Sequence, residues 1–380
     1  MYQTDNALSL VNSSSYDLRC QPQHTLTKYE RLLRAVFRQP VDRPPVWLMR
    51  QAGRYLPQYR EIRGNVPFQE VCRNPELAAE ISIQPFDILG VDAVIVFNDI
   101  LIPFEHMGLP VRFTDSGVEI QPAIRSESDL MRLHRMDFDD RPPVYETLRA
   151  IRASVGPDVP VLGFVGGPFT MAAYAVEGKL SKNFIWIRTL RYENPDFLKR
   201  LLERLTDELI RYIEFQIDAG ADVIQVFDTW AGVFTPSDYR EFILPYQKRM
   251  VRAAQMKEAP AVLYVNGCES YVTEMCESQA DVLSVDWRVD LKSVYHRTGR
   301  RCALQGNLDP AALCAPPERV AALTRSMLED FGSVPGYIAN LGHGILPNTP
   351  VESVQAFVET VQSNNCGAPA PAYPKVSSML

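Results

Sequence analysis

The chain has 380 residues, a formal net charge of −7 and 46% hydrophobic residues. This composition is typical of a globular protein with a sizeable core, and the length suits one large α/β barrel. The negative charge argues against a general nucleic-acid binder, and no apolar run approaches the roughly 18 residues of a membrane span. The seven cysteines are scattered without a C-x-x-C motif, which indicates reduced intracellular thiols.

Both ends of the chain are expected to lie outside the folded domain. Residues 1–25 are polar and lack an apolar signal core, so they predict a disordered arm and make a poor transit peptide. Residues 364–380 are rich in Ala, Pro and Ser and predict a loose tail. The folded domain is therefore expected over residues 26–363.

Eight short apolar runs end abruptly in polar residues or glycine, which is typical of strands. In chain order they are Val46–Met49, Ala93–Phe97, Val159–Phe164, Val223–Phe227, Ala261–Val265, Val282–Val285, Cys302–Leu304 and Tyr337–Leu341. Helical spacing marks Pro75–Leu89, Pro195–Ala219, Ser237–Met256, Pro316–Phe331 and Pro350–Val361. The alternation predicts an α/β fold of one domain, a closed (β/α)8 TIM barrel, with an open doubly wound sheet as the alternative.

Two inserts interrupt this alternation. Gly53–Arg73 follows the first predicted strand, and Leu101–Arg141 follows the second. Within the second insert, Val111–Phe113 and Val118–Ile120 predict a β-hairpin around Asp115-Ser116-Gly117.

A dense cluster of arginines follows the first predicted strand. Five arginines and a single glutamate lie between Arg43 and Arg63, with Trp47, Gly53 and Tyr55 interleaved. Guanidinium groups bind carboxylates bidentately and stay charged. The stretch therefore predicts a wall at the barrel mouth for a substrate that carries several carboxylates, and a solvated, salt-bridged loop is the alternative.

Other polar residues also follow predicted strands, where barrel enzymes place their catalytic groups. Asp99 follows a very apolar strand, which favours a buried carboxylate that stabilises a cation; a helix cap or an ion-pair partner is the alternative. His343 lies between two glycines that let backbone approach a ligand, although a structural histidine is the alternative. The turn Gly163–Thr170 matches no nucleotide-binding motif and predicts backbone pressed against a ligand. Asp228-Thr229 ends the fourth predicted strand.

Seven strings extend this pattern over most of the chain, from about Leu32 to Val361. They read RPPVWLMRQAGRYLPQYREIR, VIVFNDIL, GFVGGPFTMAAYAVEG, QVFDTWAG, SVDW, LQGNLDP and NLGHGILPNTP. In this order and at these separations they resemble the uroporphyrinogen decarboxylase family. The resemblance implies a (β/α)8-barrel homodimer that uses neither cofactor nor metal. It would remove carbon dioxide from the four acetate arms of uroporphyrinogen, in haem or chlorophyll biosynthesis, and release coproporphyrinogen.

The same resemblance assigns roles to residues of this chain. Asp99 would lie beneath the macrocycle, accept hydrogen bonds from the pyrrole N–H groups and stabilise the cation formed in the reaction. Arg50 and Arg54 would hold acetate or propionate groups, with Arg50 also a candidate proton donor. The remaining substrate contacts would be Tyr174, Thr229 and His343 around the reacting arm, with Phe164 and Tyr59 as aromatic walls. Thr229 stands where the family commonly has serine, and Tyr59 where some members have phenylalanine.

Two other functions fit parts of the pattern. Zinc-dependent methyltransferases of the same superfamily carry a His-x-Cys motif after the fifth strand. This chain has Asn266-Gly267-Cys268 at that place. Cys268 and His343 alone cannot form a three-ligand catalytic zinc site. A non-catalytic tetrapyrrole binder would keep the arginines but could lose Asp99. We expect a cytoplasmic protein, with the plastid stroma as the alternative because tetrapyrrole synthesis in photosynthetic eukaryotes is plastidic.

Overall fold

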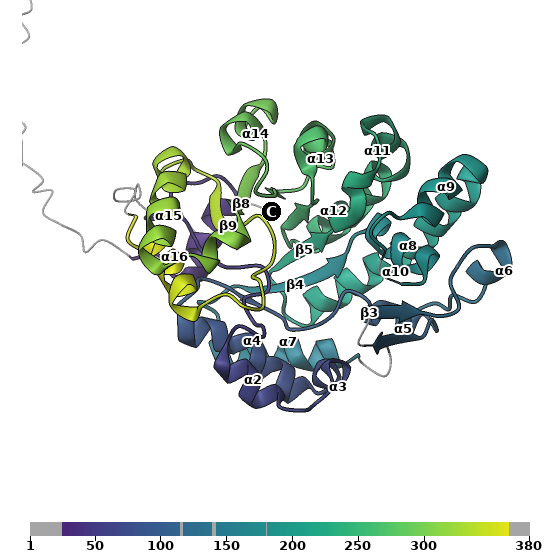
Figure 1. Cartoon of the computed structure of the whole chain (residues 1–380), viewed down its shortest axis with the longest axis horizontal. Helices are drawn as coiled ribbons and strands as arrows, with labels where there is room; N and C mark the ends of the chain where they lie inside the picture. Colours follow the sequence, from purple (N-terminus) through teal and green to yellow (C-terminus); the bar gives the residue numbers. More distant parts are fainter. Residues whose placement is uncertain (1–24, 115–116, 139–141, 180, 365–380) are drawn as a thin grey trace, which may run out of the picture.

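Parallel strands follow one another in chain order around the main sheet of the protein (Figure 1). The computed structural model describes residues 25–114, 117–138, 142–179 and 181–364. Within these residues the sheet has seven strands: β1 (Val94–Ile95), β4 (Val161–Gly166), β5 (Val223–Phe227), β6 (Ala261–Tyr264), β7 (Val282–Ser284), β8 (Ala303–Leu308) and β9 (Tyr337–Leu341). This order is that of a (β/α)8 barrel and excludes the doubly wound alternative, in which the strand order reverses.

The segment predicted as the first strand, Val46–Met49, closes the barrel without forming a regular strand. Val46 makes a single parallel bridge to Ala339 of β9. On the other side, the Asp92 N–H donates to the Val46 carbonyl over 2.7 Å, just before β1. The prediction of a full strand was wrong because the N–H groups of Leu48 and Met49 donate to the side chains of Gln51 and Asn340, and so do not join a ladder with a neighbouring strand.

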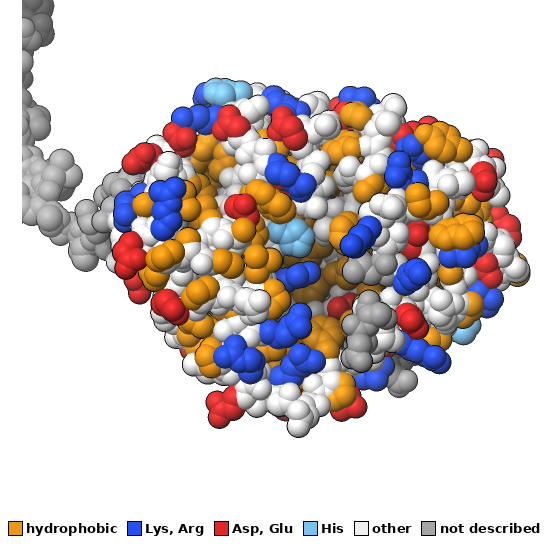
Figure 2. All heavy atoms as spheres, in the orientation of Figure 1, with side chains coloured by type: hydrophobic (Ala, Val, Ile, Leu, Met, Phe, Trp, Pro, Cys, Tyr) orange, Lys and Arg blue, Asp and Glu red, His pale blue; other side chains and the backbone are white. Residues whose placement is uncertain are grey.

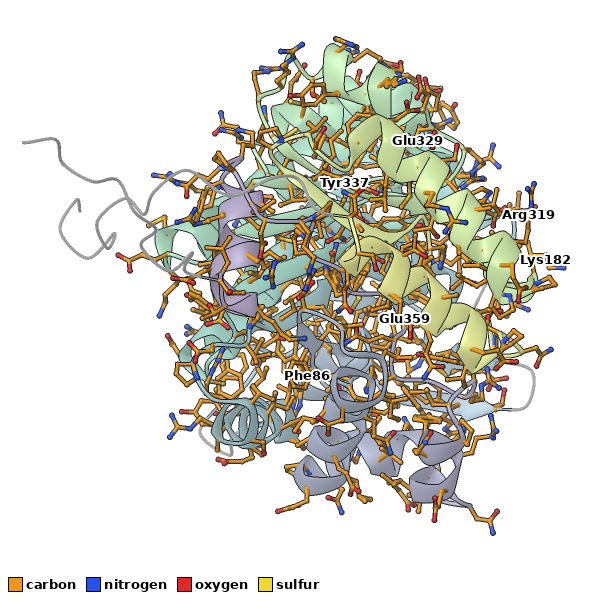
Figure 3. The ribbon with its side chains drawn as sticks, turned by 90° about the vertical axis from the view of Figure 1, so that its left-hand side faces the viewer. Phe86, Lys182, Arg319, Glu329, Tyr337 and Glu359 are labelled. Atoms are coloured by element: carbon orange, nitrogen blue, oxygen red, sulfur yellow. The ribbon has the colours of Figure 1, made fainter. Side chains whose placement is uncertain are left out.

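Helices surround the strands in Figure 1. Four of the predicted helices are confirmed within two residues: α4 (Pro75–Leu89), α10 (Pro195–Asp218), α15 (Pro317–Phe331) and α16 (Val351–Gln362). Further helices that the sequence did not indicate are α7 (Pro143–Val155), α8 (Pro168–Glu177), α9 (Ile185–Glu193), α13 (Val272–Glu277) and α14 (Leu291–Arg297). Side chains of Asn74 and Asn194 cap the N-termini of α4 and α10 by accepting backbone N–H groups. Figure 3 shows α15 and α16 side by side, with Tyr337 of β9 beside them.

The predicted helix Ser237–Met256 is two helices, α11 (Pro236–Phe242) and α12 (Leu244–Met256). Pro245 has no N–H for the carbonyl one turn earlier, and Ile243 adopts a non-helical φ of −123°. The single-helix prediction therefore failed at this proline.

Both predicted inserts are present. The first contains α2 (Pro57–Arg63) and α3 (Phe68–Arg73), and the second contains α5 (Ile102–His106) and α6 (Glu127–Leu130). The predicted hairpin is confirmed: β2 (Val111–Thr114) and β3 (Gly117–Ile120) pair antiparallel, with Val111 opposite Ile120. Residues 115 and 116 of its turn lie outside the described residues.

The barrel interior is apolar at the base and polar above it. At the base, α1 (Lys28–Val36) packs Leu32 and Val36 into the same cluster as Ile95 and Ile338. Above them lies a polar layer, formed by Trp47, Gln225, Ser284 and Gln305. Trp47 donates to Gln305 over 2.9 Å, and Gln305 donates to Ser284 over 2.9 Å and to Gln225 over 3.1 Å. Buried polar atoms linked in this way hold neighbouring strands in register.

Aspartates at the base join three pairs of neighbouring barrel segments. Asp222, just before β5, accepts the Val161 N–H over 2.7 Å and returns its own N–H to the Val161 carbonyl. Asp281, before β7, does the same with Ala261, over 2.9 Å and 3.0 Å. The same pairing joins Asp92 to Val46, so one local device recurs around the base.

The predicted arm at residues 1–25 and the tail at 364–380 lie almost wholly outside the described residues, so these expectations stay predictions. Among the described helices, none is both long and apolar enough to cross a membrane.

Candidate active site

Arg50 stands where the first barrel segment ends, in a backbone conformation that residues other than glycine rarely adopt. Its φ angle is +61°. The Met49 N–H before it donates to the Asn340 side-chain oxygen over 3.1 Å, and the Met49 carbonyl accepts the Ile345 N–H over 3.0 Å. These bonds fix the direction in which Arg50 leaves the barrel, as expected of a strained residue at a functional site.

The Arg50 side chain lies across Gly344, in the loop after β9. A Cβ atom at Gly344 would lie 2.3 Å from Cδ of Arg50, so only glycine leaves room for this side chain. Arg50 is exposed, and no carboxylate pairs with it in the described part of the chain. Its charge lowers the pKa values of both Asp99 and His343, so these three groups lie within electrostatic range of one another.

Asp99 follows β1 and is partly buried. Its Oδ1 accepts the Leu101 N–H over 2.8 Å at the start of the turn into α5, so the capping alternative describes one of its two oxygens. Oδ2 makes no hydrogen bond with any residue that the structure describes. Burial raises the pKa of Asp99 to about 6, although the Leu101 hydrogen bond and the Arg50 charge oppose the rise. Near neutral pH, Asp99 is therefore a carboxylate with one oxygen available to a ligand.

Tyr174 reaches the same region from α8. The charge of Asp99 adds to the effect of burial in raising the pKa of Tyr174, so the two groups lie within electrostatic range of each other. Thr229, next to Trp230, begins the 3-10 turn η1 (Thr229–Val233) after β5 and is partly buried. The structure thus brings Tyr174 close to Asp99 and places Thr229 on the adjoining strand end.

His343 lies at the end of β9, where its ring packs edge-on against those of Tyr264 and Trp287 at centroid distances of 5.9 and 6.5 Å. Its Nδ1 accepts the Gly344 N–H over 2.6 Å, which leaves the proton on Nε2. Burial, with help from the Arg50 charge, lowers the pKa of His343 to about 4. His343 is therefore a neutral N–H donor near pH 7.

Arg288 is a second cation at this mouth that the sequence reading missed. Its Nε donates to Asp286 over 2.8 Å and its guanidinium lies 4.6 Å from the centre of the Trp287 ring. Its charge also lowers the His343 pKa. The signal was present, because Arg288 directly follows the quoted string SVDW at the end of the sixth predicted strand.

The five arginines predicted as one wall are divided between the two ends of the barrel. Arg43 is at the base, where it makes two hydrogen bonds to the buried carboxylate of Asp92, at 2.6 and 2.9 Å. Arg60 donates to the carbonyl of Arg54 over 2.7 Å, whereas the side chain of Arg54 is exposed. The wall prediction was therefore wrong for Arg43, whereas carboxylate binding by Arg50 and Arg54 stays a prediction.

The two aromatic walls occupy different depths. Phe164 of β4 is partly buried, and its ring packs against Phe227 at 5.7 Å at the upper edge of the barrel interior. Tyr59 of α2 is 3% exposed and packs against Phe97 at 5.7 Å. Phe164 is thus placed to form the floor of a ligand site, whereas Tyr59 supports the insert from within the core.

Asp228 belongs to the scaffold. It is fully buried, accepts the Thr170 N–H over 2.8 Å and accepts Gln247 over 2.8 Å. A Cβ atom at Gly167 would lie 2.2 Å from Cβ of Asp228, so the glycine turn before α8 is pressed against this carboxylate. The glycine turn therefore lies against Asp228, and the predicted contact of its backbone with a ligand stays a prediction.

The residues of the zinc alternative do not assemble a metal site. Cys268 is fully buried, and its backbone N–H donates to Asp286 over 2.9 Å. Burial raises the Cys268 pKa, which opposes the thiolate that zinc requires. Among the described residues, no group of three or more His, Cys, Asp or Glu side chains could hold a metal ion.

Figure 2 shows the assembled mouth as a hollow at the centre of this face. Lys and Arg side chains gather along one side of the hollow, over the α2 region, and a His side chain lies at its edge. A positive rim over a hollow that contains one partly buried carboxylate suits a polyanionic ligand with N–H donors at its centre.

The fold is shared with methyltransferases. A methyltransferase from Methanosarcina mazei matches with a TM-score of 0.72 and 26% identity, over 89% of this chain and 98% of that one. A B12-independent methionine synthase from Shewanella sp. W3-18-1 matches with a TM-score of 0.51 and 15% identity, over 77% of this chain and 89% of that one. The latter likeness concerns the barrel alone.

The sequence relatives are more specific. A uroporphyrinogen decarboxylase from Pelobacter propionicus is 44% identical over 334 residues, 87% of this chain and 98% of the relative. One from Myxococcus xanthus is also 44% identical, over 87% of this chain and 95% of the relative. The family model described as uroporphyrinogen decarboxylase (URO-D) matches residues 27–364. The chain belongs to the uroporphyrinogen decarboxylase family.

Proposed function

We propose that this chain removes carbon dioxide from the acetate arms of uroporphyrinogen, giving coproporphyrinogen, and that Asp99 is its central electrostatic group. The observation that carries the proposal is the Asp99 carboxylate, which keeps one oxygen free inside a mouth lined by Arg50, Tyr174 and His343. A single carboxylate at the centre of a positive rim complements a macrocycle with pyrrole N–H groups inside and carboxylates outside. In a site that binds only a polyanion, the negative charge of Asp99 would repel the ligand.

The reaction needs a place for the electrons of the bond that breaks. Protonation of the ring carbon next to the one that bears the acetate arm makes the ring a cation, with positive charge on the arm-bearing carbon. The electrons of the C–CO2 bond then flow into this cation as carbon dioxide leaves, and the exocyclic methylene takes a proton to become a methyl group. Loss of the first proton restores the pyrrole. Asp99, which accepts pyrrole N–H bonds in a partly desolvated site, stabilises the cation more than the neutral ring and so lowers the barrier.

The other polar side chains at the mouth bind the acetate and propionate arms of the substrate. The guanidinium groups of Arg50 and Arg54 pair with acetate or propionate carboxylates. Arg288, which follows β7, adds a further positive charge at the mouth. His343 donates its Nε2–H to a carboxylate of the reacting arm, and Tyr174 and Thr229 offer hydroxyl groups beside Asp99. Because a guanidinium remains charged, carboxylate binding suits Arg50 better than proton donation.

The test is anaerobic incubation of the purified protein with reduced uroporphyrinogen. We expect four molecules of carbon dioxide per ring and coproporphyrinogen as the product, with much slower release from the Asp99→Asn variant as the comparison. Tight binding of the tetrapyrrole without carbon dioxide release would favour the non-catalytic binder. Stoichiometric zinc together with methyl transfer to a thiol would favour the methyltransferase.

We further propose that the protein is a homodimer, for which the family resemblance is the support, and sedimentation equilibrium of the full chain tests it. Placement in the cytoplasm, with the plastid stroma as the alternative, is likewise a proposal, and cell fractionation tests it.

A further inference from the structure

The parallel ladder between β1 and β4 ends before the mouth of the barrel. Its last bond runs from the Val96 N–H to the Leu162 carbonyl, over 3.0 Å. In a continued parallel ladder, the Phe164 N–H would donate to the Val96 carbonyl, and the Asn98 N–H to the Phe164 carbonyl. In the described part of the chain neither bond forms. The two strands therefore separate just where β1 leads into Asp99.

A glutamine side chain from α10 takes the place of β1 in this ladder. Oε1 of Gln216 accepts the Phe164 N–H and Nε2 donates to the Phe164 carbonyl, both over 3.0 Å. Gln216 is fully buried, and a Cβ atom at Gly163 would lie 2.8 Å from its Oε1, so glycine at this position lets the amide reach the strand. The amide therefore satisfies both backbone groups that the separation of the strands leaves without a partner.

Helix side chains also bind the segment that follows β1. The Phe97 N–H donates to Oγ of Ser82 on α4 over 2.8 Å. The Asn98 side chain donates to the Tyr212 hydroxyl over 2.9 Å. Tyr212 is buried and lies on α10 one turn before Gln216, whose Nε2 also donates to the Tyr212 carbonyl over 3.4 Å. One helix therefore binds both sides of the gap between the strands.

The separation of the strands affects Asp99 directly, because Asp99 is the next residue after Asn98. A ladder continued to Asn98 would pair this residue with Phe164 and move the Asp99 backbone towards β4. With the strands apart, the chain instead turns at Asp99 into α5, and Oδ1 of Asp99 accepts the Leu101 N–H in this turn. The position of the carboxylate thus depends on bonds made by α10.

We propose that Tyr212 and Gln216 are positioning residues for Asp99: they keep β1 and β4 apart and so hold the carboxylate where the pyrrole cation forms. This role rests on the proposed function, because it matters for turnover only if Asp99 acts on the substrate. Both side chains are buried and act through the strand ends that they bind. If their role were only structural, their loss would lower stability and leave turnover per folded molecule unchanged.

Two substitutions remove these bonds and nearly keep the side-chain volume. Per folded molecule, we expect kcat to fall about tenfold in Gln216→Met and about threefold in Tyr212→Phe, with KM within about twofold of the wild type, because small misplacements of a catalytic group are costly. The matched control is Thr206→Val, which removes a buried hydroxyl of α10 that bonds within the helix, to the Leu202 carbonyl over 2.6 Å. An unchanged kcat in both variants, or an equal loss in the control, would overturn the proposal.

Amide hydrogen exchange of the full chain tests the same role without substrate. The Leu101 N–H is bonded to Asp99, so its exchange rate reports a displacement of that carboxylate. Exchange at Leu101 should be faster in Gln216→Met and in Tyr212→Phe, and as in the wild type in Thr206→Val. Unchanged exchange at Leu101 in both variants would show that the two residues only support the strands.

The two measurements also separate this role from the proposed function. A wild-type protein that releases no carbon dioxide would refute the proposed function. Exchange at Leu101 would still decide whether Tyr212 and Gln216 hold Asp99 in place: faster exchange supports the positioning role, and unchanged exchange refutes it.

Discussion

The two ends of this barrel treat charge in opposite ways. At the base, Asp92 is fully buried and accepts both Arg43, at 2.6 Å, and Arg31, at 3.3 Å. At the mouth, Arg50 has no carboxylate partner in the described part of the chain, and Asp99 keeps one oxygen unpaired. Paired charges stabilise the closure of the barrel, whereas the unpaired charges at the other end are left for a ligand. Arginines in one sequence cluster thus have different roles: Arg43 precedes the barrel segment Val46–Met49 and lies at the base, whereas Arg50 follows it and lies at the mouth.

The largest effect on catalysis should come from Asp99. We expect Asp99→Asn to lower kcat/KM by about 10²–10³-fold, the range for loss of a preorganised electrostatic group. The fold should be unaffected, because the amide oxygen of asparagine can still accept the Leu101 N–H. Anaerobic carbon dioxide release, with urea unfolding of the same samples, measures both. Asp290→Asn, at the exposed N-cap of α14, is the matched control. Turnover within threefold of the wild type would remove Asp99 from the mechanism.

The base should show the reverse behaviour. Asp92→Asn leaves Arg31 and Arg43 without their shared carboxylate, and breaking a buried pair in this way costs about 3–5 kcal/mol of unfolding free energy. Activity per folded molecule should stay near wild type, because the mouth is untouched. Urea unfolding measures the free energy of unfolding, and active-site titration measures the activity per folded molecule. A variant of normal stability that had lost turnover would show that the ends are not separate in function.

Substitution of Arg50 by glycine should weaken substrate binding but preserve or raise stability. Arg50→Gly removes a guanidinium that binds carboxylate, so KM should rise by about 10–100-fold, as for a charged hydrogen bond worth roughly 1.5–3 kcal/mol. Glycine also accepts the φ of +61° without strain, so the unfolding free energy should stay the same or rise by up to about 1 kcal/mol. Arg50→Ala, which keeps the strain, is the control. A fall in stability for the glycine variant, with KM unchanged, would reverse this assignment.

Much of the difference between mouth and base could be predicted from sequence. The predictions that failed did so for definite physical reasons. Short apolar runs ending in polar residues placed Asp99 and His343 at strand ends, because a strand that fills a barrel is recognisable locally. The pairing of Arg43 with Asp92 was not predictable in this way, because the partners are 49 positions apart and meet only when the barrel closes. The left-handed backbone at Arg50 likewise arises from bonds to Asn340 and Ile345, far along the chain.

The residues missed at the mouth have a similar origin. Arg288 follows a string that matched the family, yet a single arginine in a loop carries no periodic or spacing signal. Its proximity to His343 depends on β7 and β9 ending at the same edge of the barrel. Asp228 shows the converse error: a polar residue at a strand end can be scaffold, and only its complete burial and its bonds to Thr170 and Gln247 reveal this.

The smallest effect should come from His343, and the pH profile separates it from Asp99. The pKa of Asp99 is raised to about 6, so kcat/KM should fall below pH 6 as the carboxylate is protonated. His343, whose pKa is lowered to about 4, stays neutral through this range. His343→Gln should therefore lower kcat/KM by about tenfold, for one lost neutral hydrogen bond, and leave the midpoint of the acid limb near pH 6.

The contributions of Asp99 and His343 to the free energy of unfolding should depend on pH in opposite directions. The folded protein disfavours ionised Asp99, so its contribution is favourable at low pH and is lost as pH rises from 3.8 through about 6. The folded protein also disfavours charged His343, so that contribution is present above pH 6.5 and is lost as pH falls towards 4. In Asp99→Asn the first dependence should vanish while the second remains. A midpoint of activity that moved with His343→Gln, and not with changes at Asp99, would mean that the histidine is the titrating group at the mouth.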